Sequence, residues 1–126
     1  MKSELAVHLP ETDAELRDFL ESSTVGLRWV DPGGHILWAN RAELDLVGYA
    51  QAEYLGRHIA DFLVEPKAAA DILARLARGE NIDSYETRVR AKDGSVKRVL
   101  VNGSGLFRDG QFVHSRLVTR DITNLM

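Results

Sequence analysis

The sequence predicts an α+β domain in which short helices are inserted between the second and third strands of an antiparallel sheet. Three observations support this prediction. Strand-like runs separated by turn residues come first, a helical apolar pattern follows, and strict alternation of apolar and polar residues begins at Ile82. The chain has 126 residues and a mass of 14.1 kDa, which fits one domain.

The first part of the chain, residues 1–24, is predicted to be a polar lead followed by a short amphipathic helix. Leu16, Phe19 and Leu20 recur at the spacing of one helical face, and Thr12 or Asp13 could cap the helix. We expect this helix to bury one side.

Two strands and their turn come next. Val25 to Val30 is apolar and partly β-branched, residues 31–34 read Asp-Pro-Gly-Gly, and His35 to Ala39 is a second strand-like run. The pattern predicts a hairpin.

Three helical segments follow the hairpin. Asn40 and Gly48 bracket residues 41–47 as an N-cap and a C-terminal glycine, and residues 50–55 can form another short turn of helix. The longest predicted helix runs from Lys67 to Arg78, with Pro66 in its first turn and one apolar face.

The last 45 residues predict a three-stranded meander. Tyr85, Thr87 and Val89 alternate with charged residues, so the third strand should have one wet face. Asp-Gly turns at 93–94 and 109–110 separate it from a fourth strand, residues 96–106, and a fifth, residues 112–122. The fourth strand is apolar on both faces, as a central strand would be.

Composition excludes several classes of protein. The chain has no cysteine, which rules out disulfides, cysteine-ligated metal sites and a thiol nucleophile. Its longest runs without an acidic or basic residue are nine residues, against about 20 for a membrane span. The net charge of −3, with scattered basic residues, argues against nucleic-acid binding. The N-terminus lacks the apolar core of a secretory signal, so we expect a cytoplasmic location.

Several short motifs, taken in order, resemble the PAS domain family of sensory modules in signalling proteins. The resemblance covers about Val25 to Thr123. It rests on the strand, turn, strand and Asn cap of residues 30–40, and on Gly48-Tyr49, Glu53-Tyr54-Leu55-Gly56-Arg57, Lys92-Asp93-Gly94 and Arg120-Asp121-Ile122-Thr123.

The resemblance implies a fold and a mode of action. The five strands would lie in the spatial order 2-1-5-4-3, with helices enclosing a small pocket on one face. Such domains bind a ligand, cofactor or partner domain, are rarely enzymes, and pass the change on through the last strand. Asp121 and Thr123 would fix the exit of the chain, and residues 124–126 would begin a linker to an effector domain.

Strand periodicity and the resemblance together give a set of pocket candidates. Tyr85 and Thr87 should point inward by alternation, whereas the resemblance turns Leu100, Asn102 and Ser104 inward on the fourth strand and Val113 and the residues alternating with it on the fifth. The pocket candidates are Arg28, Val30, Leu46, Ile59, Ile72, Leu76, Tyr85, Thr87, Leu100, Asn102, Ser115, Leu117 and Thr119.

Arg28 is the unusual member of this set, because an unpaired buried charge is costly. Three interpretations stay open. It could anchor a carboxylate or phosphate of a ligand, pair with an internal acid such as Asp61 or Glu65, or lie on the surface if the strand phase is shifted by one residue.

Family cofactors can be tested against the residues. Flavin photosensors of this family carry a reactive cysteine where this chain has Ile59, so cysteine-linked flavin photochemistry is excluded. The helix that supplies an axial histidine in haem-binding members has no histidine here, which argues against haem and leaves His58 as the nearby alternative. The four histidines are too dispersed for a metal cluster, and no catalytic constellation is visible.

The function predicted is ligand sensing in a homodimer linked to an effector, with the identity of the ligand or cofactor unknown. The alternative is a PAS fold used only for dimerisation or protein interaction, with a filled pocket. In either case the expected dimer interface comprises the N-terminal helix and the opposite sheet face, including Leu16, Phe19, Leu20 and Trp29. His114 should lie on that opposite face as a packed or interfacial imidazole.

Overall fold

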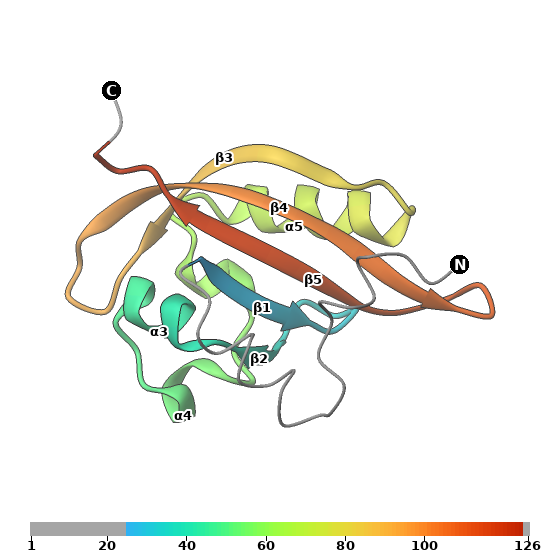
Figure 1. Ribbon diagram of the computed structural model, residues 1–126, viewed down its shortest axis with the longest axis horizontal. Helices are drawn as coiled ribbons and strands as arrows, with labels where there is room; N and C mark the ends of the chain where they lie inside the picture. The colour runs from blue at the N-terminus through green and yellow to red at the C-terminus, as the bar shows by residue number, and fades with distance from the viewer. Residues whose placement is uncertain (1–24, 125–126) are drawn as a thin grey trace, which may run out of the picture.

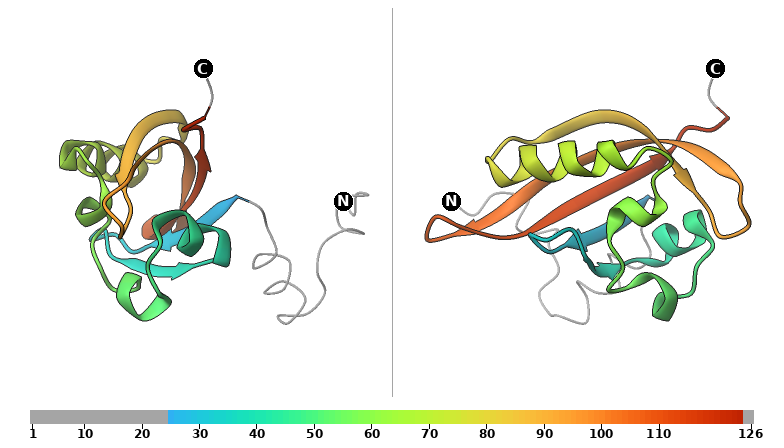
Figure 2. Two further views of the ribbon diagram at one scale, coloured as in Figure 1. Left: turned by 90° about the vertical axis from the view of Figure 1, so that its left-hand side faces the viewer. Right: turned by 180° about the vertical axis from the view of Figure 1, so that it is seen from behind.

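The protein is described by a computed structural model over residues 25–124, which form a five-stranded antiparallel sheet with helices on one face (Figures 1 and 2). The strand order is β2-β1-β5-β4-β3, as predicted. The elements are β1 Gly26–Val30, β2 Ile36–Ala39, α3 Arg41–Val47, α4 Gln51–Tyr54, the 3-10 helix η1 Ile59–Phe62, α5 Pro66–Ala77, β3 Ile82–Arg90, β4 Val96–Arg108 and β5 Gln111–Asp121. The predicted N-terminal helix with Leu16, Phe19 and Leu20 lies outside the described residues.

The last strand, β5, runs through the middle of the sheet between β1 and β4 (Figure 1). The two Asp-Gly turns connect β3, β4 and β5 as a meander, and both Gly94 and Gly110 adopt positive φ angles. The long β4–β5 hairpin extends past the end of β1 (Figure 1). Because β5 contacts strands from both ends of the chain, it links the hairpin β1–β2 to the meander.

Asn40 joins the end of the first hairpin to the first helix. Its side-chain oxygen accepts hydrogen bonds from the backbone N–H of Glu43, at 3.0 Å, and of Leu27, at 2.9 Å. Its amide group donates to the carbonyl of Val25 at 3.0 Å. The predicted N-cap is therefore confirmed, and the same side chain also fixes β1 against α3.

Helix α3 ends at Gly48, which has a φ of 77° and donates its N–H to the carbonyl of Leu44. This left-handed conformation suits glycine, as the sequence predicted. The 3-10 turn η1 was not predicted, because four residues carry too little periodicity to reveal it. His58 caps η1 through Nδ1, which accepts from the N–H of Ala60 at 3.0 Å.

The core lies between the helices and the inner face of the sheet. Figure 2 shows the helical segments gathered on that face. Helix α5 contributes a buried stripe, and the 3-10 turn and α4 add two aromatic rings 4.8 Å apart, those of Phe62 and Tyr54. The other fully buried core side chains include Val30, Ile36, Ile59, Ile72, Leu76, Val99, Val101 and Leu117.

The prediction of which side chains point toward the helices was correct on β1, β3 and the buried part of β5, and wrong on β4. Val99 and Val101 are buried against the helices, whereas Leu100 and Asn102 are partly exposed and Ser104 is exposed on the opposite face. The pairing agrees, because Val101 lies opposite inward-facing Thr119. Since β4 is apolar on both faces, its alternation could not decide between the two orientations. Val113, which was also expected to point inward, lies near the tip of the β4–β5 hairpin and is 38% exposed.

Replacing Asn40 by alanine tests the connection between β1 and α3. Asn40→Ala should lower the free energy of unfolding by about 2–3 kcal/mol, because two backbone donors lose their acceptor in a buried setting. Chemical denaturation measures the change, with the exposed Asn81→Ala as the control. Equal stability of the two variants would contradict the assigned role.

Candidate functional site

Three polar side chains meet in the interior between β1, α3 and α4. The Arg28 Nη1 atom donates to Glu43 Oε2 at 3.3 Å and to the Tyr54 hydroxyl at 3.1 Å. The Tyr54 hydroxyl in turn donates to Glu43 Oε2 at 2.5 Å. The exposed fractions are 2% for Arg28, 1% for Glu43 and 0% for Tyr54. We call these three residues the buried polar cluster.

The chain shapes this cluster through the small residue Gly26. Gly26 faces inward two residues before Arg28, and a Cβ atom at this position would collide with the Glu43 carboxylate. The absence of a side chain therefore lets α3 approach the sheet closely enough for Glu43 to reach Arg28. Burial, and next the Glu43 carboxylate, raise the pKa of Tyr54 far above its ordinary value, so its hydroxyl stays protonated and donates.

The cluster leaves polar atoms without hydrogen bonds. Within residues 25–124, Arg28 Nε, Glu43 Oε1 and the nearby Thr119 hydroxyl are buried and have no partner. Thr119 pairs with Gly26 across β1 and β5, so its side chain lies on the same inner patch. Buried polar atoms normally find a partner, so these three mark a place where a further group could bind.

Of the three interpretations left open for Arg28, the surface position is wrong, and its internal partner is Glu43 rather than either of the acids named as candidates. Asp61 pairs instead with Arg57 at 3.0 Å, and Glu65 pairs with Arg88 at 3.2 Å. Sequence reasoning missed Glu43 and Tyr54. A signal for Glu43 was present, since it lies one helical turn before the buried Val47 and therefore on the apolar face of α3.

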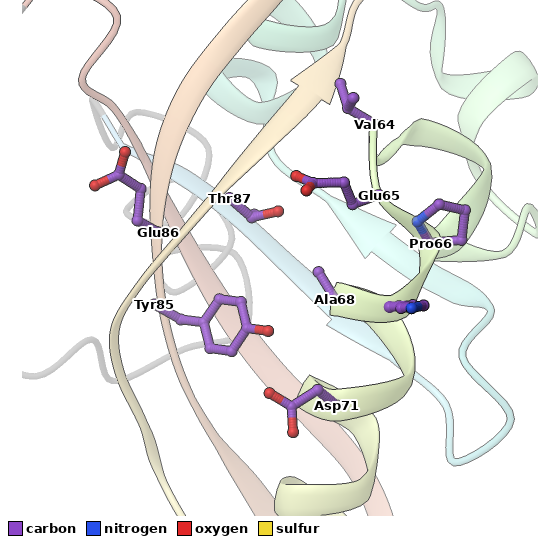
Figure 3. Close-up of a pocket in the computed structure, with 9 residues that line it drawn as sticks. Val64, Glu65, Pro66, Ala68, Asp71, Tyr85, Glu86 and Thr87 are labelled. Atoms are coloured by element: carbon purple, nitrogen blue, oxygen red, sulfur yellow. The ribbon is translucent and has the colours of Figure 1, made fainter.

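A groove runs between the N-terminal half of α5 and the edge strand β3 (Figure 3). It has a volume of about 640 Å³ and is open to solvent. Tyr85 and Thr87 of β3 form one wall, and Ala68 and Asp71 of α5 form the other (Figure 3). Tyr85 and Thr87, two of the predicted pocket residues, thus come together here.

The charges around this groove are largely balanced by neighbouring arginines. Ion pairs of 3.2 Å join Glu65 to Arg88, Asp71 to Arg75 and Glu86 to Arg98. Burial, and then the hydrogen bond with Asp71, raise the pKa of the Tyr85 hydroxyl. The groove therefore offers hydrogen-bonding groups without a strong net charge.

The remaining pocket candidates fall into three groups. Val30, Ile59, Ile72, Leu76 and Leu117 are packed in the hydrophobic core, and Leu46 packs partly buried against it. Ser115 is buried, and its hydroxyl donates to the carbonyl of Val30 at 3.4 Å. Leu100 and Asn102 lie on the other face, where Asn102 accepts a hydrogen bond from the N–H of Ser84 at 2.8 Å.

The end of β5 is fixed by a short network at Asp121 and Thr123. Asp121 Oδ1 accepts from the Thr123 N–H at 2.9 Å and from its hydroxyl at 2.6 Å. Thr123 Oγ1 accepts from the N–H of Arg98 at 3.0 Å, and the Ile122 N–H donates to the carbonyl of Arg98 at 2.8 Å. The chain therefore leaves β5 in a direction set by its neighbour β4.

The outer sheet face carries a cluster of rings. Trp29 stacks on His114, with centroids 4.9 Å apart, and lies 5.7 Å from Trp38. The Arg116 guanidinium lies over the Trp29 ring at 5.6 Å. Burial and the nearby Arg116 lower the pKa of His114, so its imidazole is neutral at pH 7. We call Trp29, Trp38 and His114 the outer aromatic cluster.

Among residues 25–124, no group of three or more potential metal ligands comes together, and no helix is long and apolar enough to cross a membrane.

Comparison with known proteins defines the family. The sequence profile of the PAS fold matches residues 14–122, which is most of the chain. The chain therefore belongs to the PAS family, whose domains are sensory modules and in general not enzymes.

Individual relatives agree with this class. The chain is 39% identical over 85 residues to the C4-dicarboxylate transport sensor protein DctS of Rhodobacter capsulatus; the match covers 64% of this chain and spans only 13% of that protein. The PAS domain of an HTR-like protein from Haloarcula marismortui has a TM-score of 0.77 at 24% identity, with 96% of this chain and 100% of that chain covered.

A light-oxygen-voltage domain studied with a flavin analogue bears on the cofactor question. It has a TM-score of 0.71 at 28% identity, and the match covers 89% of this chain and 87% of that chain. Because the present chain contains no cysteine, cysteine-linked flavin photochemistry is not possible in it.

A double-mutant cycle tests whether Arg28 and Glu43 act as a pair. Arg28→Met and Glu43→Leu should each lower the free energy of unfolding by about 3–5 kcal/mol, because each leaves one buried charge unpaired. The double variant should be more stable than either single variant. Denaturation of the four proteins measures this coupling.

The exposed pair of Lys92 and Glu53, 2.7 Å apart, provides the control cycle. It should show little coupling, because solvent screens exposed ion pairs. Additive effects at Arg28 and Glu43 would contradict the assigned pairing.

Proposed function

We propose that this domain is the sensory part of a longer signalling protein, binding a small ligand beneath α5 and passing the change to an effector through the end of β5. The observation that carries the proposal is the position of β5. This strand lies at the centre of the sheet, has its side chains Ser115, Leu117 and Thr119 buried in the interior, and ends in the fixed exit at Asp121 and Thr123.

The groove supports the ligand-binding part of the proposal. One row of inner side chains leads from its wall across the sheet, because Tyr85 pairs with Val101, Val101 with Thr119, and Thr119 with Gly26. With strands about 4.8 Å apart, Thr119 lies about 10 Å from Tyr85. A small molecule that enters between α5 and β3 would thus meet β5.

The linkage to an effector rests on the network at the end of β5. Two hydrogen bonds tie the exit to Arg98 of β4, one from the Arg98 N–H to Thr123 Oγ1 and one from the Ile122 N–H to the Arg98 carbonyl, so a shift of β4 against β5 changes the direction of the chain beyond Asn124. The relationship to a sensor protein fits this arrangement.

Native mass spectrometry of the purified 126-residue protein, with an absorption spectrum of the same sample, tests the ligand. A bound mass is expected. Ala68→Leu should remove it, because Ala68 lines the groove from α5, whereas Ala70→Leu on the exposed side of the same helix should keep it.

An empty protein that no compound stabilises in a thermal-shift screen would overturn ligand sensing, since binding to the folded state alone raises stability. Thermal unfolding of Ala68→Leu and Ala70→Leu without added compound checks that the larger side chain has not simply disrupted the core.

A second function is favoured by the outer aromatic cluster: dimerisation through the outer sheet face. Tryptophan is enriched where proteins associate, and a two-fold interface would place this face against its own copy. The interface would comprise Trp29 together with the N-terminal residues Leu16, Phe19 and Leu20.

Matched substitutions on β5 test this dimer. Val118→Asp places a charge on the outer face, beside Leu27 and Asn102, and should convert a dimer to a monomer. Val113→Asp, at an exposed position of opposite phase, should leave the dimer intact. Sedimentation equilibrium reports the mass. A monomeric wild-type protein, or a dimer that survives Val118→Asp, would contradict dimerisation through the outer sheet face.

A further inference from the structure

The three unpartnered atoms of the interior belong to residues on neighbouring parts of β1, β5 and α3. Gly26 lies opposite Thr119 in the pairing of β1 with β5, and its inward side faces the Glu43 carboxylate. Arg28 follows two residues later on the same side of β1 and contacts that carboxylate. Arg28 Nε, Glu43 Oε1 and Thr119 Oγ1 therefore share one buried patch, formed by β1, β5 and α3.

The chemistry of these atoms defines what would satisfy them. Arg28 Nε–H is a donor only, the ionised Glu43 Oε1 is an acceptor only, and the Thr119 hydroxyl can do either. A group that completes the patch must accept one hydrogen bond and donate another.

The charge of the patch restricts the group further. Arg28 carries one positive charge, Glu43 carries one negative charge 3.3 Å away, and Tyr54 is neutral. The interior is thus already balanced. A carboxylate or phosphate would add an uncompensated negative charge, which is costly to bury, and an ammonium group would add a positive one.

We propose that this patch binds an uncharged group that accepts a hydrogen bond from Arg28 Nε and donates one to Glu43 Oε1. Two sources offer this chemistry: a buried water molecule, and the amide edge of a small organic molecule. The inference rests on the proposed sensory function and deepens it, since it gives the chemical class of the group that a ligand would present to β1 and α3 on the inner face of the sheet. It also replaces the idea that Arg28 anchors an anion.

Three probes of the same shape but different charge test the inference: acetamide, acetate and acetamidinium. The readout is the Arg28 Nε–H resonance of the 15N-labelled 126-residue protein, assigned by its loss in Arg28→Lys. If a small organic amide is the natural occupant, acetamide alone should shift this resonance. If water is the occupant, the resonance should show magnetisation transfer from a long-lived water and no shift with any probe.

A charge-changing variant sharpens the test. Glu43→Gln keeps the shape of the side chain but removes the charge that balances Arg28, so acetate should now shift the Arg28 resonance and acetamide should lose its advantage. Glu53→Gln, the same change at the exposed partner of Lys92, should keep the wild-type preference. If Glu43→Gln does not fold, the wild-type probe series alone decides.

Two results would overturn the inference. One is a shift of the wild-type Arg28 resonance by acetate. The other is a resonance with neither a water contact nor a response to acetamide, which would mean that no neutral group binds. Neither result depends on a ligand surviving purification, so an empty native mass spectrum with a positive probe result would count against the proposed sensory function alone.

Discussion

The contact between Arg28 and Glu43 is the constraint on which the interior of this domain depends. A guanidinium that points from a strand into the interior has to be neutralised, and Glu43 of α3 supplies the carboxylate, 3.3 Å away. The Tyr54 hydroxyl of α4 adds one hydrogen bond to each of the two groups, at Arg28 Nη1 and at Glu43 Oε2. The positions of two helices relative to β1 therefore follow from one buried charge, and Gly26 provides the space that the approach of α3 needs.

The same arrangement separates two regions of the inner face. Near β1, the interior is polar and holds the charged side chains of Arg28 and Glu43, which balance one another. Toward β3, the groove beside α5 is open and lined by Tyr85 and Thr87. β5 lies between these regions and contacts β1 on one side and β4 on the other, so one strand borders both of them.

Most helices, strands and turns could be predicted from the sequence, because they are encoded locally, whereas the spatial order of the strands was implied by the resemblance to the PAS family. Asn40 and Gly48 marked both ends of α3, and alternation fixed the inward face of β3. The candidate site was less predictable. The partner of Arg28 is 15 positions away on another element, and no local pattern specifies such a pair. The orientation of β4 also escaped prediction, since a strand that is apolar on both faces fits either phase.

The pairing of β1 with β5 has a consequence for how the domain folds. Ser115 and Val30 are joined by a hydrogen bond across 85 residues of sequence, whereas β3, β4 and β5 are neighbours along the chain. Closing so long a loop is entropically costly, so a meander formed from nearby segments is favoured to assemble before β1 docks. The patch around Gly26 exists only after that docking, so it is among the last parts of the protein to form.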